Sequence, residues 1–229
     1  MNSFKESPNI FDLTHDLSPM TQTFPVHWHK PVSFETLGTI EKVGRRTTQI
    51  HLGTHSGTHV DAPSHFLMEG LTIDQVHLSC FMGSAVYVDL RHIKELEIVE
   101  ARYLKQIVTA EWNNKVLIFD FGWSKNFGKD NYFANQPYFS LEACQFLLTL
   151  TPKAIGYDTA MPDNPADGYG SECDSPAHKL FLSSGIPLLE NLKISSQLPV
   201  YFEIAFFPLK LTSLDGSPVR CVGWSYAGS

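Results

Sequence analysis

Histidine is the residue that stands out in this chain. Ten histidines occur among 229 residues, and His51, His55, His59 and His65 fall within fifteen positions, with Asp61 among them. Imidazole is the commonest metal ligand near neutral pH, and two histidines with an aspartate form a usual nitrogen and oxygen set for zinc, manganese or iron. Three protein ligands leave a coordination position open for water, which a catalytic site requires. The stretch therefore predicts a catalytic metal site.

Two plainer interpretations compete with a metal site. The first three histidines recur every four residues, which is the spacing of one face of a helix. Gly53, Gly57 and Pro63 make a helix a poor prediction there, and the glycines instead suit a backbone that bends sharply. The second alternative is a surface cluster of histidines that holds no ligand.

A longer pattern surrounds these residues. The segment from Gly57 to His65 reads Gly-Thr-His-Val-Asp-Ala-Pro-Ser-His and is preceded by His55. It resembles the His-x-Gly-Thr-His-x-Asp-x-Pro-x-His signature of the cyclase-like family of metal-dependent hydrolases, which includes bacterial kynurenine formamidases and isatin hydrolases. The similarity extends over most of the chain, so we expect one domain over residues 1–229. The further similar segments are residues 11–18, 122–124, 156–159, 178–190 and 216–220.

The resemblance implies a division of labour among the site residues. His55, His59 and Asp61 would hold a first metal. Asp61 would bridge to a second metal, held by His178 and Glu190. A carboxylate can span two cations because it has two oxygens, whereas one imidazole cannot. The implied cofactor is a divalent metal, Zn²⁺ in one or two copies per chain, with Mn²⁺ as the other candidate.

Two further roles follow from the resemblance. His65 would be the acid/base histidine beside the metals, and Glu190 would take part in catalysis as well as in metal binding. His51 lies outside the matched signature, so it is expected either behind the ligands or in the core.

Buried polar residues later in the chain bear on the same site. Glu190 lies in Ile-Pro-Leu-Leu-Glu-Asn-Leu, which predicts a buried strand, where a carboxylate is costly unless it is paired or metal-bound. A purely structural role for His178 and Glu190 is the alternative. Asp158 and Asp163 are expected either to orient ligands or to lie in a surface loop. Met161 stands where the family often has serine, which bears on polar contacts to the substrate.

Aromatic residues near the N-terminus suggest where a substrate ring would lie. Phe24-Pro25 resembles an aromatic-Pro pair of the family's formamidases, but the usual Trp-Pro-Gly is absent. Phe24 and Trp28 are therefore the substrate-binding candidates, with core or subunit-interface roles as alternatives. Residues 131–139 predict an exposed aromatic segment that forms either a lid or an oligomer contact.

The resemblance implies a hydrolase that cleaves the C–N bond of a small aryl amide, formamide or lactam, as an arylformamidase does. In this hypothesis metal-activated water attacks the carbonyl and His65 relays the proton to the leaving amine. An ester or lactone hydrolase and a non-catalytic metal- or ligand-binding protein are the alternatives. A serine hydrolase is disfavoured because no Gly-x-Ser-x-Gly occurs. The family also implies a homodimer or homotetramer.

Composition bears on whether the protein binds nucleic acid, spans a membrane or is secreted. Asp and Glu outnumber Lys and Arg by 24 to 17, and a net charge of −7 argues against a nucleic-acid partner. No apolar run reaches the roughly 20 residues of a membrane span. The N-terminus lacks a signal-peptide pattern, and the four cysteines fit no thiolate cluster, so we expect reduced thiols in a cytoplasmic protein.

The elements that must position these residues are mostly short strands. Strands are predicted at residues 10–17, 46–52, 84–90, 116–121, 200–206 and 219–224. Helices are predicted at residues 100–108, at 141–150 with Ser140 as cap, and from Ser175-Pro176 to Gly185. The predicted fold class is therefore α/β in the broad sense. Because these strands and helices do not alternate regularly, a mixed α+β domain is favoured over a doubly wound sheet. The resemblance adds a central β-barrel-like sheet flanked by helices, of the swivelling β/β/α type.

Overall fold

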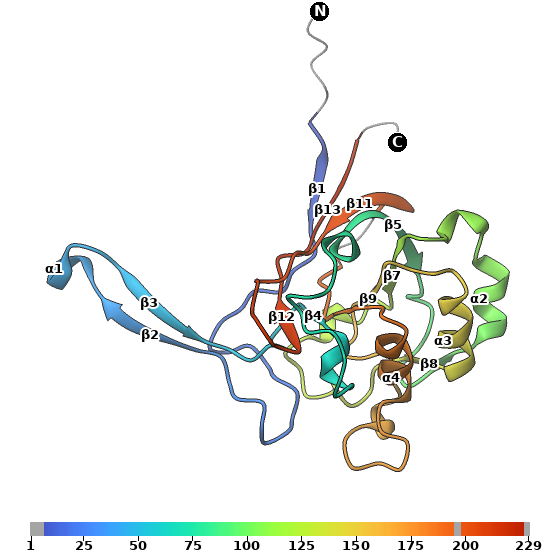
Figure 1. Ribbon diagram of the computed structural model, residues 1–229, viewed down its shortest axis with the longest axis horizontal. Coiled ribbons are helices and arrows are strands. Elements are labelled where there is room, and N and C mark those ends of the chain that lie inside the picture. Colours follow the sequence, from blue (N-terminus) through green and yellow to red (C-terminus); the bar gives the residue numbers. More distant parts are fainter. Residues whose placement is uncertain (1–6, 195–197, 227–229) are drawn as a thin grey trace, which may run out of the picture.

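One curled sheet of nine strands organises the protein (Figure 1). The computed structural model describes residues 7–194 and 198–226. Strand order in the sheet is β1-β13-β11-β5-β7-β9-β10-β4-β12. Its strands are β1 (Asn9–Asp12), β4 (His59–Asp61), β5 (Met82–Asp89), β7 (Val116–Asp120), β9 (Ala154–Tyr157), β10 (Leu188–Glu190), β11 (Tyr201–Ala205), β12 (Gly216–Pro218) and β13 (Val222–Ser225).

The middle of the sheet is parallel and carries the longer helices. Strands β5, β7, β9 and β10 run in the same direction. The three connections between them contain α2 (Ala101–Ile107) from β5 to β7, α3 (Leu141–Leu148) from β7 to β9 and α4 (Pro176–Ser183) from β9 to β10. These helices lie together on one side of the sheet (Figure 1). A small two-stranded sheet of β6 (Ile98–Val99) and β8 (Tyr138–Phe139) lies beside them.

Both faces of the central sheet are buried, and β7 shows why. All five of its residues are buried, and alternate side chains enter different cores. Leu117 and Phe119 belong to the cluster that includes the helices, whereas Val116 and Ile118 belong to the cluster on the other face. A strand covered on both faces reads as a continuous apolar run, as Val-Leu-Ile-Phe does here.

The predicted class is confirmed, with corrections at element ends. The strand expected at residues 10–17 ends at Asp12, and the one expected at 219–224 begins at Val222. Ser140 caps α3 as expected, because its hydroxyl accepts the Ala143 N–H. Ser175 precedes α4 in a left-handed conformation, but its side chain does not cap the helix.

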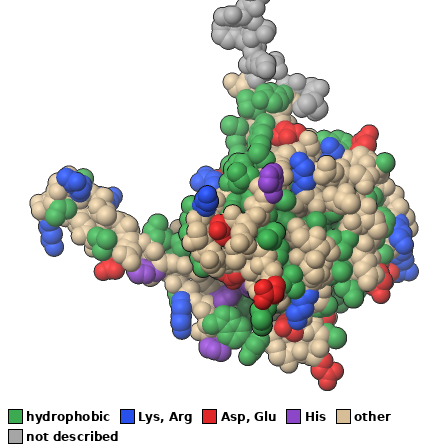
Figure 2. Space-filling model, in the orientation of Figure 1, with side chains coloured by type: hydrophobic (Ala, Val, Ile, Leu, Met, Phe, Trp, Pro, Cys, Tyr) green, Lys and Arg blue, Asp and Glu red, His purple; other side chains and the backbone are tan. Residues whose placement is uncertain are grey.

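A hairpin arm projects from this body, and the sequence analysis recognised only one of its strands. The arm consists of β2 (Ser33–Gly38), α1 (Ile40–Val43) and β3 (Thr47–His51). It stands away from the sheet and helices, with Lys and Arg side chains near its tip (Figures 1 and 2). Every residue of β3 is exposed, so neither face of the arm is covered within the chain.

The remaining helical elements are short 3-10 helices: η1 (Pro63–His65), η2 (Leu78–Phe81), η3 (Ala110–Trp112), η4 (Ser124–Asn126) and η5 (Pro165–Asp167).

The cysteines are unpaired thiols, with Cys144 and Cys221 buried. Within residues 7–194 and 198–226, no helix is long and apolar enough to cross a bilayer. The cytoplasmic location and the single domain stay predictions.

Candidate metal centre

Strand register brings the first set of site residues together. Strand β4 lies between β10 and β12, with Glu190 opposite His59 and Gly216 opposite Asp61. His59 and Asp61 share one face because side chains alternate along a strand, while Val60 points into the core on the other face. The segment before β4 is irregular, as the glycines predicted, so the helix interpretation is wrong.

Asp61 lies at the centre of the cluster. Its Oδ1 is 2.7 Å from Nδ1 of His55 and 3.3 Å from Nε2 of His59, and its Oδ2 is 3.7 Å from Nε2 of His178. Oδ2 is buried and has no hydrogen-bond partner. Two donor groups share this carboxylate: His55, Asp61 and His65 form one, and His59, Asp61 and Glu190 form the other.

Glu190 ends β10 with its carboxylate buried. Its Oε2 is 3.4 Å from Nε2 of His59, and its Oε1 is 3.1 Å from Nε2 of His178. The hydroxyl of Tyr157, at the end of β9, donates to Oε1 at 2.6 Å. Burial and the nearby Glu190 carboxylate raise the pKa of Tyr157 well above its usual value, so the phenol keeps its proton.

His178 is held from the helix side by Asp163. Oδ2 of Asp163 lies 2.5 Å from Nδ1 of His178, and the same carboxylate accepts the backbone N–H groups of Ala177 and His178. These N–H groups belong to the first turn of α4. The surface-loop alternative for Asp163 is therefore wrong, because its side chain is buried against the predicted ligand.

His65 belongs to the first donor group, with its ring 4.0 Å from that of His55, and a residue that the sequence analysis missed contacts both histidines. Nδ1 of His65 is 3.3 Å from Oδ2 of Asp215, and Nε2 of His55 is 2.7 Å from the same oxygen. Asp215 immediately precedes β12, and its carbonyl accepts the Ala62 N–H at 2.9 Å. The similar segment identified in the sequence began one residue later, at Gly216, so the aspartate was left out.

The charges of the cluster favour a cation. Burial alone would lower the pKa of His55, but Asp61 and Asp215 raise it to about 10. Burial would raise the pKa of Asp61, but His55 and His65 hold it well below its usual value. Asp61 thus stays ionised and stabilises positive charge among the imidazoles, which either protons or a metal can supply.

The donor set fits a divalent metal. It combines imidazole nitrogens with carboxylate oxygens within 4.8 Å of one another in each group, the chemistry that zinc and manganese accept. The unpartnered Oδ2 of Asp61 adds a specific argument, because a buried carboxylate oxygen is costly unless something binds it. Asp61 belongs to both groups, as a bridging carboxylate would.

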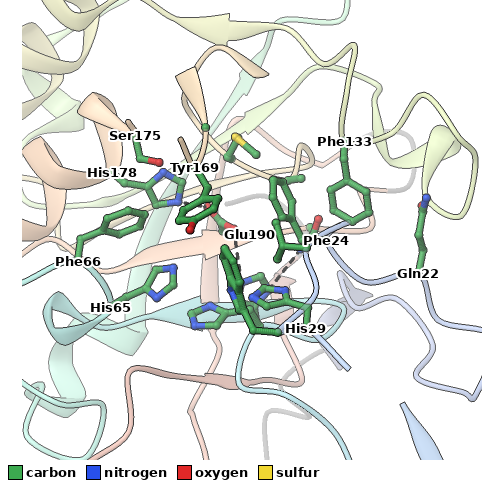
Figure 3. A pocket seen from close by; sticks show the side chains of 18 of the residues that line it. Gln22, Phe24, His29, His65, Phe66, Phe133, Tyr169, Ser175, His178 and Glu190 are labelled. Carbon is green, nitrogen blue, oxygen red and sulfur yellow. Dashed lines mark hydrogen bonds and ion pairs between the residues drawn. The ribbon is translucent and has the colours of Figure 1, made fainter. Parts of the chain in front are cut away.

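A cavity of about 210 Å³ opens beside the cluster (Figure 3). The predicted site residues His55, His59, His65, His178 and Glu190 all contribute to its wall. Aromatic side chains line it as well: Phe24, Trp28, Phe66, Phe133 and Tyr169.

The two substrate-binding candidates occupy this aromatic part. Phe24 makes an edge contact with Phe133 at 5.3 Å between ring centroids. Trp28 is 44% exposed and contacts Tyr169 edge-on at 4.6 Å, so its core alternative is wrong. His29, which the sequence analysis did not select, lines the same cavity with its ring parallel to that of His55 at 6.0 Å.

Three other expectations need correction. His51 is neither behind the ligands nor in the core: it ends β3 with half of its side chain exposed, 3.6 Å from Glu35. Asp158 is buried, but it accepts the backbone N–H groups of residues 121, 123 and 124 instead of touching a predicted ligand. The segment 131–139 is not uniformly exposed, since Tyr132 is fully buried.

Tyr132 has an indirect connection to the site. Its hydroxyl donates to Oδ1 of Asn191 at 2.8 Å, and Nδ2 of Asn191 donates to the carbonyl of Gly57 at 3.0 Å. The same carbonyl lies 2.8 Å from Nδ1 of His59. This chain of contacts leaves Nε2 of His59 facing Asp61 and Glu190.

Two relatives by sequence are kynurenine formamidases. A Kynurenine formamidase of Geobacillus thermodenitrificans (strain NG80-2) is 30% identical over 172 residues, 75% of this chain and 77% of that protein. A Kynurenine formamidase of Bacillus mycoides (strain KBAB4) is 27% identical over 92% of both chains.

Solved structures share the fold. An isatin hydrolase bound to the product analogue thioisatinate has a TM-score of 0.83 and 22% identity, over 96% of this chain and 93% of its own. Isatin hydrolase A from Ralstonia solanacearum has a TM-score of 0.83 and 23% identity, over 95% and 92%. The family model described as "Putative cyclase" matches residues 11–164. The chain therefore belongs to the cyclase family, as the signature around His59 predicted.

Proposed function

We propose that this protein is a metal-dependent hydrolase that cleaves the C–N bond of a small aryl amide, formamide or lactam. The observation that carries the proposal is the shared carboxylate of Asp61, which belongs to two groups of metal donors whose histidines and Glu190 line an aromatic cavity. The relatives by sequence are named kynurenine formamidases, and proteins with the same fold are named isatin hydrolases, so both names point to hydrolysis of a small aryl compound.

The proposed ligands are His55, His59, Asp61, His178 and Glu190. A divalent cation bound there supplies an acidic water and stabilises negative charge on a carbonyl oxygen. Zn²⁺ is the proposed ion, in one or two copies, and Mn²⁺ is the alternative because both accept this donor set.

The chain's own residues position the substrate and move the proton. His65 lies on the cavity wall and belongs to the donor group of His55 and Asp61, so it is within reach of a water or an amide held there. An imidazole can take a proton from the attacking water and return it to the nitrogen that leaves. Amide cleavage needs that second transfer, since an amide anion is a poor leaving group. Glu190 is the other proposed catalytic residue, because its carboxylate lines the cavity next to His59 and His178.

The cavity favours an aromatic substrate. Phe24 and Trp28 would contact the ring while the scissile bond faces His65. N-formylkynurenine and isatin-like lactams are the substrates to test first, because the similar proteins are named kynurenine formamidases and isatin hydrolases. Ester or lactone hydrolysis on the same site is the second candidate, since the donor groups would stabilise either carbonyl.

Metal content and hydrolysis measured side by side test the proposal. Wild type and His65→Ala are analysed for bound metal by mass spectrometry and assayed on N-formylkynurenine, an aryl lactam and an aryl ester, with His92→Ala at an exposed histidine as control. We expect metal in every protein, and a loss of kcat of about 10²- to 10⁴-fold in His65→Ala on the amides. Absence of metal from wild type after addition of Zn²⁺ or Mn²⁺ would refute the proposal, and so would bound metal without turnover of any of these substrates.

We also propose that the protein is a homo-oligomer, a dimer or a tetramer, assembled through the hairpin arm. Phe34 and Ile50 are directly opposite each other on β2 and β3, and they are 45% and 59% exposed. Leu37, Ile40 and Val43 add exposed apolar surface towards the tip. A two-stranded hairpin is only marginally stable on its own in water, so a second copy of the chain is the proposed cover.

A further inference from the structure

A single carboxylate oxygen connects the two functions of the site. Oδ2 of Asp215 lies 2.7 Å from Nε2 of His55 and 3.3 Å from Nδ1 of His65. The rings of these histidines are 4.0 Å apart at an interplanar angle of 33°. His55 is a proposed metal ligand and His65 the proposed acid/base group, so Asp215 touches one member of each class.

Backbone contacts fix the position of Asp215 next to the site. The carbonyl of Asp215 accepts the Ala62 N–H at 2.9 Å, and the next residue, Gly216, pairs with Asp61 across β12 and β4. A Cβ at Gly216 would approach the carbonyl of Val60 to 2.8 Å and Cε1 of His55 to 3.1 Å. The close approach of this strand to the site therefore depends on glycine after the aspartate.

We propose that Asp215 is a positioning residue that fixes which nitrogen of each ring carries the hydrogen. This inference rests on the proposed function for the part that concerns His65. Both nitrogens of His55 face carboxylate oxygens at 2.7 Å, Nε2 that of Asp215 and Nδ1 that of Asp61, so a bound metal would take the place of the hydrogen on Nδ1 while Asp215 keeps the hydrogen on Nε2. The hydrogen of His65 is on Nδ1, and the bare Nε2 is left as the proton acceptor.

Two independent readouts follow from the two contacts. Loss of the contact to His55 lowers metal affinity, about 10- to 100-fold for an outer partner of a metal-bound histidine. Loss of the contact to His65 lowers kcat for substrates whose leaving group must be protonated, with KM little changed. An aryl ester with a good leaving group does not need that proton, so its kcat falls much less.

Asp74 offers a matched control. Its Oδ1 accepts the Ser213 N–H at 3.1 Å, so Asp74 holds the same loop two residues before Asp215 without touching the site. If Asp215 only anchored the loop, Asp74→Asn would reproduce its effects.

The experiment compares wild type, Asp215→Asn, Asp215→Ser and Asp74→Asn. Zinc affinity of the metal-stripped proteins is measured by competition with a chromophoric chelator, and kcat is measured on one anilide and one activated ester. We expect both Asp215 variants to bind zinc at least 10-fold more weakly, with the anilide losing at least 10-fold more kcat than the ester. Asp74→Asn should stay within about 2-fold of wild type in all readouts.

Zinc affinity equal to wild type in Asp215→Asn, or equal effects in Asp74→Asn, would overturn the inference. An equal loss of kcat on anilide and ester would overturn its His65 part. If wild type hydrolyses neither substrate, the proposed function fails, while the chelator competition still decides the role of Asp215 at His55. Circular dichroism of each variant excludes misfolding, and Asp215→Ser serves if Asp215→Asn does not fold.

Discussion

The carboxylate of Asp163 joins the first turn of α4 to the ring of His178. Its Oδ1 accepts the Ala177 N–H at the helix start, and its Oδ2 accepts the His178 N–H and lies 2.5 Å from Nδ1 of the imidazole. The helix cap and the orientation of a proposed metal ligand therefore depend on one side chain. Nε2 of His178 is left facing Glu190 and Asp61.

Replacing Asp163 should separate these two roles. Asp163→Ala loses the cap, which should lower the free energy of unfolding by about 1–2 kcal/mol, and loses the partner of His178, which should weaken metal binding about 10- to 100-fold. Asp163→Asn keeps an acceptor for one N–H, so we expect a smaller loss of stability but still weaker metal binding. Urea denaturation and chelator competition measure the two effects, with Asp130→Asn at an exposed site as control. Unchanged zinc affinity in both variants would show that the contact of Asp163 with His178 does not support metal binding.

The aromatic wall of the cavity predicts discrimination between aryl and alkyl substrates. Trp28→Leu and Phe24→Leu should each raise KM for an aryl formamide about 5- to 10-fold, since an aromatic pair contributes about 0.5–1.5 kcal/mol beyond its buried area. The formamide of a simple alkylamine is the matched control substrate, and its KM should change little. Equal changes for both substrates would assign these side chains to a structural or interface role instead.

The predictions from sequence succeeded where the signal is local. Gly57 to His65 is a contiguous pattern, and β7 and α3 each carry their own burial or capping signal. Asp215 was missed because a lone aspartate in a loop has no such signal. It reaches His55, 160 positions earlier in the chain, only through the pairing of β12 with β4. The arm was missed in part because its apolar residues are exposed, so no buried face imposes an alternating pattern on β2.

Burial of His15 predicts a pH dependence of stability. Desolvation by burial, with a smaller effect of Lys193, lowers the pKa of His15 to about 4. Its ring stacks on Phe127 at 3.9 Å, and its Nε2 is buried without a hydrogen-bond partner. Because the unfolded chain titrates near pH 6.5, it binds more protons than the folded chain between about pH 4 and 6.5. Neutral His15 therefore adds its full contribution to the free energy of unfolding above pH 6.5. The free energy of unfolding falls as the pH drops from 6.5 to 4, by at most about 3 kcal/mol.

His15→Phe should remove this dependence while keeping the stacked ring. Urea unfolding at pH 7.5 and pH 5, with a chelator present, should show wild type losing more stability on acidification than the variant. His92→Phe, at an exposed histidine, should behave like wild type. The assignment to His15 fails if wild type and His15→Phe lose the same free energy between the two pH values.

Polar residues on the hairpin arm should dissociate the proposed oligomer. Phe34 and Ile50 form a cross-strand pair on an exposed face of β2 and β3, so Phe34→Gln with Ile50→Gln removes apolar area that a second copy would bury. Leu141→Gln is the control, because Leu141 is 41% exposed on α3, at the end of the molecule opposite the arm (Figure 1). Light scattering coupled to size-exclusion chromatography should give a multiple of 25.7 kDa for wild type and the control, and a monomer mass for the double variant. A wild-type monomer across micromolar concentrations would contradict the assembly, and an intact oligomer in the double variant would place its interface away from the arm.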